Sequence, residues 1–194
     1  MAAEIKIVEE ARKPLAMHPK KFALWLFIAS VVMLFGAWTS AYLVKRADTG
    51  WAEIVLPWHF WFNTGVIVAS SATMFAATWA AKRDKLSLLR LFITITTVLG
   101  VAFLAGQLLA FNELIAMNEY FTGGNASHSF IYVLTGAHGV HVVSGVIFLV
   151  IALSSAMKYR VHSKNMDQLE MCATYWHFLG ILWLYLFVFL LLNR

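Results

Sequence analysis

Five long apolar stretches alternate along the chain with short segments rich in charged or turn-forming residues. Each stretch reaches or exceeds the roughly 20 residues that a helix needs to cross a hydrocarbon core of about 30 Å. The pattern predicts an all-α integral membrane protein, a bundle of five transmembrane helices. The predicted spans are residues 22–44, 60–81, 91–112, 129–157 and 171–192, within a membrane domain 22–194 that follows a hydrophilic segment 1–21.

The composition supports this class and excludes several others. Hydrophobic residues make up 61% of the 194 residues and the mean hydropathy is +0.73, whereas soluble domains contain about 45–50% apolar residues. The net charge of +5 comes from basic residues beside the spans, where topology and anionic lipids explain them, so we expect no nucleic-acid partner. The single cysteine, Cys172, excludes an internal disulfide, a two-cysteine copper site and covalent haem attachment.

The basic residues also predict an orientation. Twelve of the fifteen Lys and Arg residues lie in the N-terminal segment and in the second and fourth connectors. With five spans these three regions share one side of the membrane, and an excess of Lys and Arg marks the cytoplasmic side. We therefore predict a cytoplasmic N-terminus and a C-terminus on the opposite side.

Three histidines lie inside the predicted spans, where a polar side chain needs a partner. His138 and His141 are three residues apart, which predicts one shared helix face. If the last two helices are neighbours, His141 and His177 lie at similar depths and could share a hydrogen-bond network. A haem or metal bound by these two is the alternative, but we favour hydrogen bonding and expect no metal site, because no second histidine pair or carboxylate–histidine cluster accompanies them.

Two further polar residues complete the set. Gln107 lies within the third span, and Glu170 begins the fifth helix, where the helix dipole favours an acidic residue. Lys158 or Lys164 is close enough in sequence to pair with Glu170. Two rival functions remain open for such a bundle, a small haem b electron carrier and a transporter or channel.

Two motifs point to a known family. Residues 135–142 read Thr-Gly-Ala-His-Gly-Val-His-Val and Gly145 follows, which resembles the Thr-Gly-x-His-Gly-x-His-Val-x-x-Gly signature of subunit III of haem-copper terminal oxidases. Glu170, the run Tyr-Trp-His-Phe at 175–178 and Trp183 are similar to a second segment of that family. The two motifs occur in order on the last two spans, as in the short five-helix bacterial form.

The resemblance implies an accessory subunit without a redox centre in a bacterial inner membrane, with a periplasmic C-terminus. It implies packing against the catalytic subunit I, with subunit II and further respiratory subunits or a supercomplex as other partners. Haem and copper would then belong to those partners, which reduce oxygen and translocate protons. The implied roles are assembly, phospholipid binding, proton uptake and turnover stability. We expect a cytochrome c oxidase, and a quinol oxidase is the alternative.

The family also implies site residues. We expect helix packing through a polar network, and phospholipid contacts near the cytoplasmic end of the fourth helix. The network comprises His138, His141, Glu170, His177 and Gln107, and the lipid contacts are Lys158, Arg160 and Trp176. Many relatives carry carboxylates at the positions of Val31 and Gly180, so any function that depends on those acids is not carried over.

Overall fold

The computed structural model describes residues 19–53, 55–122, 125–158 and 166–193, and it confirms the five-helix, all-α fold. Each helix is long and apolar enough to cross a membrane. The helices are α1 (Pro19–Arg46), α2 (Trp58–Lys82), α3 (Leu86–Ala116), α4 (Ala126–Met157) and α5 (Asp167–Asn193).

The helices extend beyond the apolar stretches that predicted them. The largest difference is in α3, which begins at Leu86 and ends at Ala116, whereas its apolar stretch covers residues 91–112. Its 31 residues span roughly 46 Å at 1.5 Å per residue, about the thickness of a bilayer with its headgroups. Hydropathy therefore marked only the part of each helix inside the hydrocarbon, because the helices continue into the headgroup layer.

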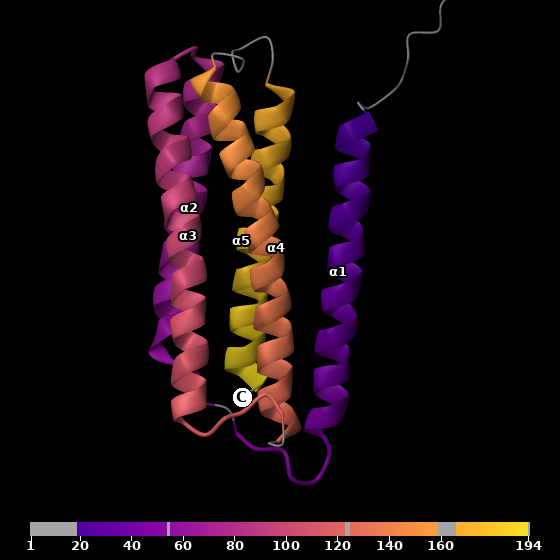
Figure 1. Cartoon of the computed structure of the whole chain (residues 1–194). Coiled ribbons are helices and arrows are strands. Elements are labelled where there is room, and N and C mark those ends of the chain that lie inside the picture. The colour runs from indigo at the N-terminus through magenta and orange to yellow at the C-terminus, as the bar shows by residue number, and fades with distance from the viewer. Residues whose placement is uncertain (1–18, 54, 123–124, 159–165, 194) are drawn as a thin grey trace, which may run out of the picture.

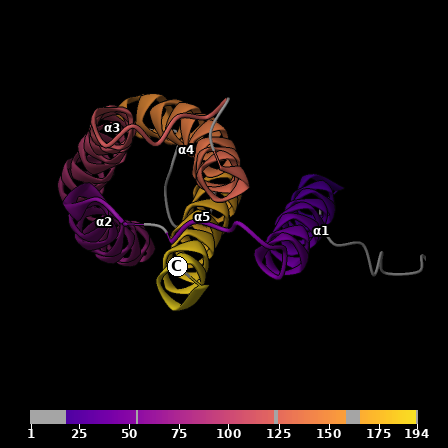
Figure 2. The same cartoon turned by 90° about the horizontal axis from the view of Figure 1, so that it is seen from below.

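Four of the helices form a closed ring, in which α2, α3, α4 and α5 each contact two neighbours. Viewed along the bundle, α1 stands outside this ring beside α4 and α5 (Figure 2). Seen from the side, α1 lies at one edge of the bundle with its axis along those of α4 and α5 (Figure 1). The molecule is thus a four-helix body with one more loosely packed helix.

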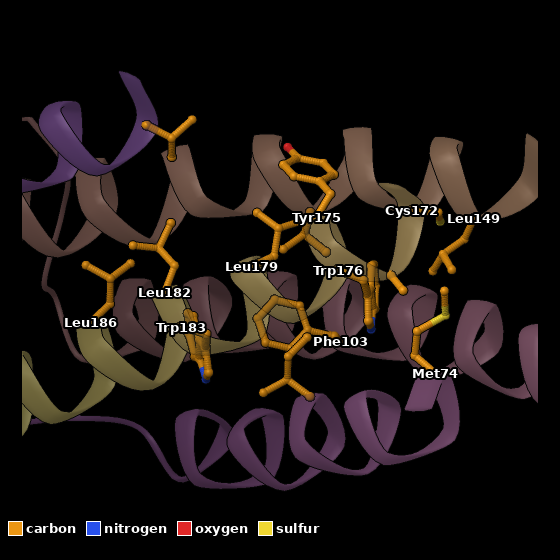
Figure 3. Close-up of a cluster of buried hydrophobic side chains, with 14 of the residues drawn as sticks. Met74, Phe103, Leu149, Cys172, Tyr175, Trp176, Leu179, Leu182, Trp183 and Leu186 are labelled. Atoms are coloured by element: carbon orange, nitrogen blue, oxygen red, sulfur yellow. The ribbon is translucent and has the colours of Figure 1, made fainter. Parts of the chain in front are cut away.

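The core is built largely around α5. Half of the most apolar part of α5 is buried inside the protein, against 22% for α1. Its two tryptophans, Trp176 and Trp183, are at most 1% exposed, and both indoles point from α5 toward α2 with Phe103 of α3 between them (Figure 3). Since a large aromatic side chain buries roughly 150–250 Å², this row accounts for much of the packing inside the ring.

Polar contacts hold α1 against α5 near both ends. At one end the Nζ atom of Lys21 lies 2.8 Å from Asp167 and 3.0 Å from Glu170. At the other end the hydroxyl of Tyr42 donates to the carbonyl of Asn193 at 2.9 Å, and Arg46 donates to the side chain of Asn193 at the same distance. These contacts fix the position of α1, of which only 22% of the most apolar part is buried. The cellular side of each end stays a prediction.

Candidate functional site

One of the buried aromatic residues of the second motif is Trp176, which is 1% exposed. Its indole Nε1 donates a hydrogen bond to Ser70 Oγ of α2 at 3.1 Å. The ring passes between two glycines: a Cβ at Gly100 would lie 2.7 Å from Cη2 of Trp176, and one at Gly145 would lie 3.3 Å from the same indole. Gly100 and Gly145 therefore allow α3 and α4 to close around one tryptophan of α5.

This burial corrects one prediction. Trp176 is 1% exposed, so its side chain is enclosed by protein on all sides and offers no surface to a phospholipid. The family resemblance implied a lipid contact, but Gly100 and Gly145 leave room for the indole in the core instead. Trp176 is a packing residue rather than a lipid contact.

His138 lies beside the other tryptophan. Its ring centroid is 5.2 Å from that of Trp183 and 5.9 Å from that of Phe103, and the side chain is fully buried. Neither ring nitrogen has a hydrogen-bond partner among the described residues. The indole of Trp183 donates to Thr64 Oγ1 at 3.1 Å. His138 therefore contributes to the bundle as a flat ring in an aromatic layer.

His141 faces another neighbour. Its Nδ1 donates to the carbonyl of Ala137 at 2.7 Å, and its ring packs against Phe27 and Phe35 of α1, with centroids 6.2 and 5.8 Å away. Residues three apart differ by about 60° around a helix, and here that angle separates the ring interior from the side covered by α1. The expected shared face of His138 and His141 is therefore divided between two sets of contacts.

His177 points in a third direction. It lines a groove between α5 and α2 together with Ile67, Ser71 and Gly180, and in the described part of the chain no hydrogen bond joins it to His141. The predicted network between these two histidines is not formed, because α5 turns His177 toward α2 while α4 turns His141 toward α1. Two rings that face different neighbouring helices also do not have the geometry of axial ligands to one haem.

A tyrosine provides the hydrogen bond between α4 and α5 that was expected from the histidines. The hydroxyls of Tyr175 and Ser144 lie 2.7 Å apart, and the Tyr175 hydroxyl also donates to the carbonyl of His141 at 3.4 Å. In the sequence Tyr175 stood out only as part of a motif, and Ser144 was given no role. The signal that could have found this contact is a pair of hydroxyl side chains on two predicted helices that follow one another along the chain.

Gln107 is buried and linked to α2. Asn63 Nδ2 donates to Gln107 Oε1 at 3.4 Å, and both side chains are at most 3% exposed. The Asn63 side chain lies directly over the backbone of Gly106. The partner of Gln107 thus comes from α2, 44 residues away in sequence, and not from a histidine of the proposed network.

Glu170 pairs with a residue that the sequence did not suggest. Its carboxylate lies 3.0 Å from Lys21 of α1, so it connects the first helix to the last. Lys158, one of the expected partners, is an exposed residue directly after α4. Lys164 and the proposed lipid contact Arg160 lie outside the described residues.

Two histidine–carboxylate pairs lie at the opposite end of the bundle. His59 Nδ1 is 2.5 Å from Glu113 Oε2 and ties α2 to α3. In the connector before α4, Glu119 Oε1 is 3.9 Å from His128 Nε2. Burial raises the pKa of the Glu119 carboxyl, while His128 and the backbone N–H of Val55 oppose that shift. The first pair thus joins two helices, and the second fastens the connector between α3 and α4 to the start of α4.

The described residues contain no group of three or more His, Cys, Asp or Glu side chains that could hold a metal ion. The bundle is instead an apolar body whose polar side chains join helices to one another. The lipid-exposed surface, with its grooves beside α5, is the part available to other molecules.

Comparison with known proteins agrees with the motifs. The family model for cytochrome c oxidase subunit III matches residues 8–193. A cytochrome c oxidase subunit 3 from Alkalihalophilus pseudofirmus is 26% identical over 92% of this chain and 93% of its own length. The cytochrome bo(3) ubiquinol oxidase subunit 3 of Buchnera aphidicola is 27% identical over 90% and 86%, and a cytochrome c oxidase subunit 3 from Thermostichus vulcanus is 28% identical over 89% and 88%.

A match that covers nearly the whole chain includes both histidine motifs and all five helices. Subunit III is one component of a multi-subunit terminal oxidase, which implies partner oxidase subunits in the same membrane. The chain belongs to the cytochrome c oxidase subunit III family and is a multi-pass inner-membrane subunit of a haem-copper terminal oxidase.

Proposed function

We propose that this chain is the accessory subunit of a proton-translocating cytochrome c oxidase, in which it supports assembly, binds phospholipid and sustains the turnover of the catalytic subunit I. The observation that carries the proposal is the way α1 is attached. Its ends are fixed to α5 by ion pairs and hydrogen bonds, while a groove of about 410 Å³ remains open between their middle parts.

The lining of this α1–α5 groove suits an acyl chain. It is formed by Val32, Phe35 and Gly36 of α1 and by Phe178, Ile181, Leu182 and Tyr185 of α5. The one polar group among these side chains, the hydroxyl of Tyr185, donates to Thr39 at 3.0 Å. An apolar groove whose polar atoms are already paired favours a hydrocarbon occupant, because a lipid tail forms no hydrogen bonds.

The basic residues after α4 would hold the headgroup of such a lipid. Lys158 is exposed at the end of α4, and Arg160 follows two residues later. Each basic residue near an anionic surface contributes about 1 kcal/mol of attraction. A long side chain can also reach the headgroup layer while its methylene groups stay among apolar atoms.

Neutralising both residues tests this part of the proposal. In the oxidase carrying Lys158→Gln and Arg160→Gln, we expect less copurifying anionic phospholipid, with zwitterionic lipid unchanged, as measured by lipid mass spectrometry of the purified complex. A matched control is Lys82→Gln with Arg83→Gln, which removes two exposed basic residues at the end of α2 and leaves the attachment of α1 intact. An anionic lipid content equal to that of the unmodified complex would contradict the assignment.

Any support of proton uptake by this subunit would be indirect. Val31 is 2% exposed and contacts its neighbours as an apolar core residue, and Gly180 packs close to Ser71 of α2. Neither position supplies a titratable group. The subunit would therefore act by holding subunit I and its lipids in place, which affects the lifetime of the active enzyme more than its initial rate.

The central experiment compares the oxidase purified with and without this chain. We expect the complete complex to oxidise cytochrome c and consume oxygen, and the depleted complex to begin at a comparable rate but lose activity sooner during turnover. Equal lifetimes would refute the supporting role.

A quinol oxidase is the second candidate, since the Buchnera relative named as a ubiquinol oxidase subunit is as similar as the others. Oxidation of ubiquinol but not of cytochrome c would establish that alternative.

A further inference from the structure

A second groove lies on the outer side of the four-helix ring, between α2 and α5. It has a volume of about 420 Å³ and is open to the surroundings of the bundle. Its lining includes Ile67, Ser71 and Phe75 of α2 and His177, Gly180 and Leu184 of α5. We refer to these six residues as the α2–α5 groove. It differs from the α1–α5 groove in the polar groups that it contains.

The polar groups of the α2–α5 groove lie near the middle of the membrane. His177 is ten residues into α5 and about three residues, or roughly 5 Å, from the midpoint of that helix. Ser71 is one residue past the midpoint of α2. The headgroup layer begins roughly 10 Å from His177 on the nearer side and roughly 15 Å from Ser71, so neither headgroups nor bulk water can serve as the regular hydrogen-bond partner of these side chains.

Within the described parts of the chain, His177 and Ser71 also have no internal partner. Both are partly exposed, and no hydrogen bond connects either side chain to another described residue. Gly180 brings the two helices together here, since a Cβ at that position would lie 3.0 Å from Ser71 Oγ. The imidazole of His177 and the hydroxyl of Ser71 therefore lie beside Gly180 in a groove that opens into an apolar environment. A hydrocarbon chain would leave both groups unpaired.

The groove continues along α5 for the length of a helix segment. A second hollow of about 480 Å³ adjoins it and includes Leu184, Val188 and Leu192. From His177 to Leu192 the two hollows follow α5 for roughly 22 Å at 1.5 Å per residue, much of the hydrocarbon thickness. A helix laid beside α5 would cover a surface of this length, and unlike an acyl chain it can carry a side chain that pairs with the two polar groups.

We propose that a transmembrane helix of another oxidase subunit docks in the α2–α5 groove and presents a hydrogen-bonding side chain to His177 and Ser71. Small residues at a helix crossing and polar side chains facing it are the features that join helices in lipid. The imidazole–hydroxyl pair supplies the second of these features, while the buried Gly180 keeps α2 and α5 close enough for both polar groups to share one groove. The inference rests on the chain's membership in a multi-subunit oxidase, and it specifies which face of this subunit contacts a partner.

Site-specific photo-crosslinking in the assembled oxidase tests the proposal. A benzophenone amino acid replaces Leu184 in the groove or, as a control, Leu108 on the outer surface of α3, which is 64% exposed. After irradiation in native membranes, we expect the label at position 184 to yield an adduct with another oxidase subunit, with the crosslink in a transmembrane segment. The label at position 108 should yield no such adduct.

Substitution of His177 provides an independent measurement. His177→Leu should lower the fraction of partner subunit retained through detergent washing by about threefold or more, whereas His177→Gln should retain it, because the amide can still hydrogen-bond. The thermal unfolding of the isolated chain should be the same for both variants, which separates a docking role from a folding role. Retention of the partner by His177→Leu at the unmodified level would overturn the proposal.

The remaining outcomes are also decisive. Adducts from position 184 with lipid alone, or with a second copy of this chain, would overturn the docking of a partner helix. So would a partner adduct from position 108 and none from position 184. Because lipid content and turnover lifetime are measured on the same preparations, loss of this inference is distinguishable from failure of the proposed function, which concerns the α1–α5 groove and the lifetime of the enzyme.

Discussion

Replacing Trp176 with alanine is expected to destabilise the folded chain by about 3–5 kcal/mol, the range for large aromatic side chains removed from a packed core. The indole is 1% exposed and lies between Gly100 and Gly145. Neither glycine has a side chain that could move into the cavity, so relaxation would require movement of α3 or α4. The variant also leaves Ser70 without the donor that it accepts from at 3.1 Å.

The measurement is unfolding of the purified chain in mixed micelles with increasing denaturing detergent. Trp25→Ala is the matched control, since Trp25 of α1 is 55% exposed and its removal should change stability by less than about 1 kcal/mol. Trp176→Phe should fall between the two, because it keeps most of the ring volume and loses the hydrogen bond. If Trp176→Ala unfolded at the same detergent concentration as Trp25→Ala, the packing account of the second motif would be wrong.

The fold could be predicted because hydropathy alone determines where a chain crosses a bilayer. A helix is the conformation in which one apolar stretch satisfies its own backbone hydrogen bonds in lipid. The number and order of the helices followed directly from five such stretches. The ends of the helices did not follow from these stretches, as α3 illustrates. Helical hydrogen bonding continues into the headgroup layer, where apolar residues are no longer required.

The site residues were harder to place because helical spacing does not identify the neighbouring helix. His138 and His141 are three residues apart, and the angle between them is enough to put one against Phe103 and Trp183 and the other against α1. Nothing in the local sequence reveals that α1 stands outside a ring of four. The directions of side chains depend on that arrangement, which arises from contacts between distant segments.

The polar partners were missed for the same reason. Lys21 pairs with Glu170 across 149 positions of sequence, and Asn63 reaches Gln107 across 44. Short separation along the chain favours Lys158 and Lys164 as the partners of Glu170. In a bundle of transmembrane helices, however, residues at the same depth on neighbouring helices meet whatever their separation along the chain. Sorting polar residues by predicted depth would have brought Lys21 and Glu170 together.

The contact between α2 and α3 at Gly106 gives the second prediction of a large effect. A Cβ at this position would lie 2.1 Å from Oδ1 of Asn63, far inside van der Waals contact. In Gly106→Ala the Asn63 side chain must therefore move, and its buried hydrogen bond to Gln107 is lost. Overpacking typically destabilises by 1–3 kcal/mol and an unpaired buried amide by a similar amount, so we expect a loss of about 2–4 kcal/mol.

Detergent unfolding again provides the measurement, and the chain offers a close control. Gly65→Ala adds the same methyl group to α2, where nothing lies within 4 Å of the new atom, so it should be neutral or slightly stabilising because alanine favours helix more than glycine does. The double variant Gly106→Ala with Asn63→Ala removes the clash together with the amide, and it should recover part of the lost stability. Non-additivity of this kind indicates direct contact between two positions. Additive losses in the double variant would instead place the effect of Gly106→Ala elsewhere in the helix, and the buried link between Asn63 and Gln107 would no longer explain how α2 is held against α3.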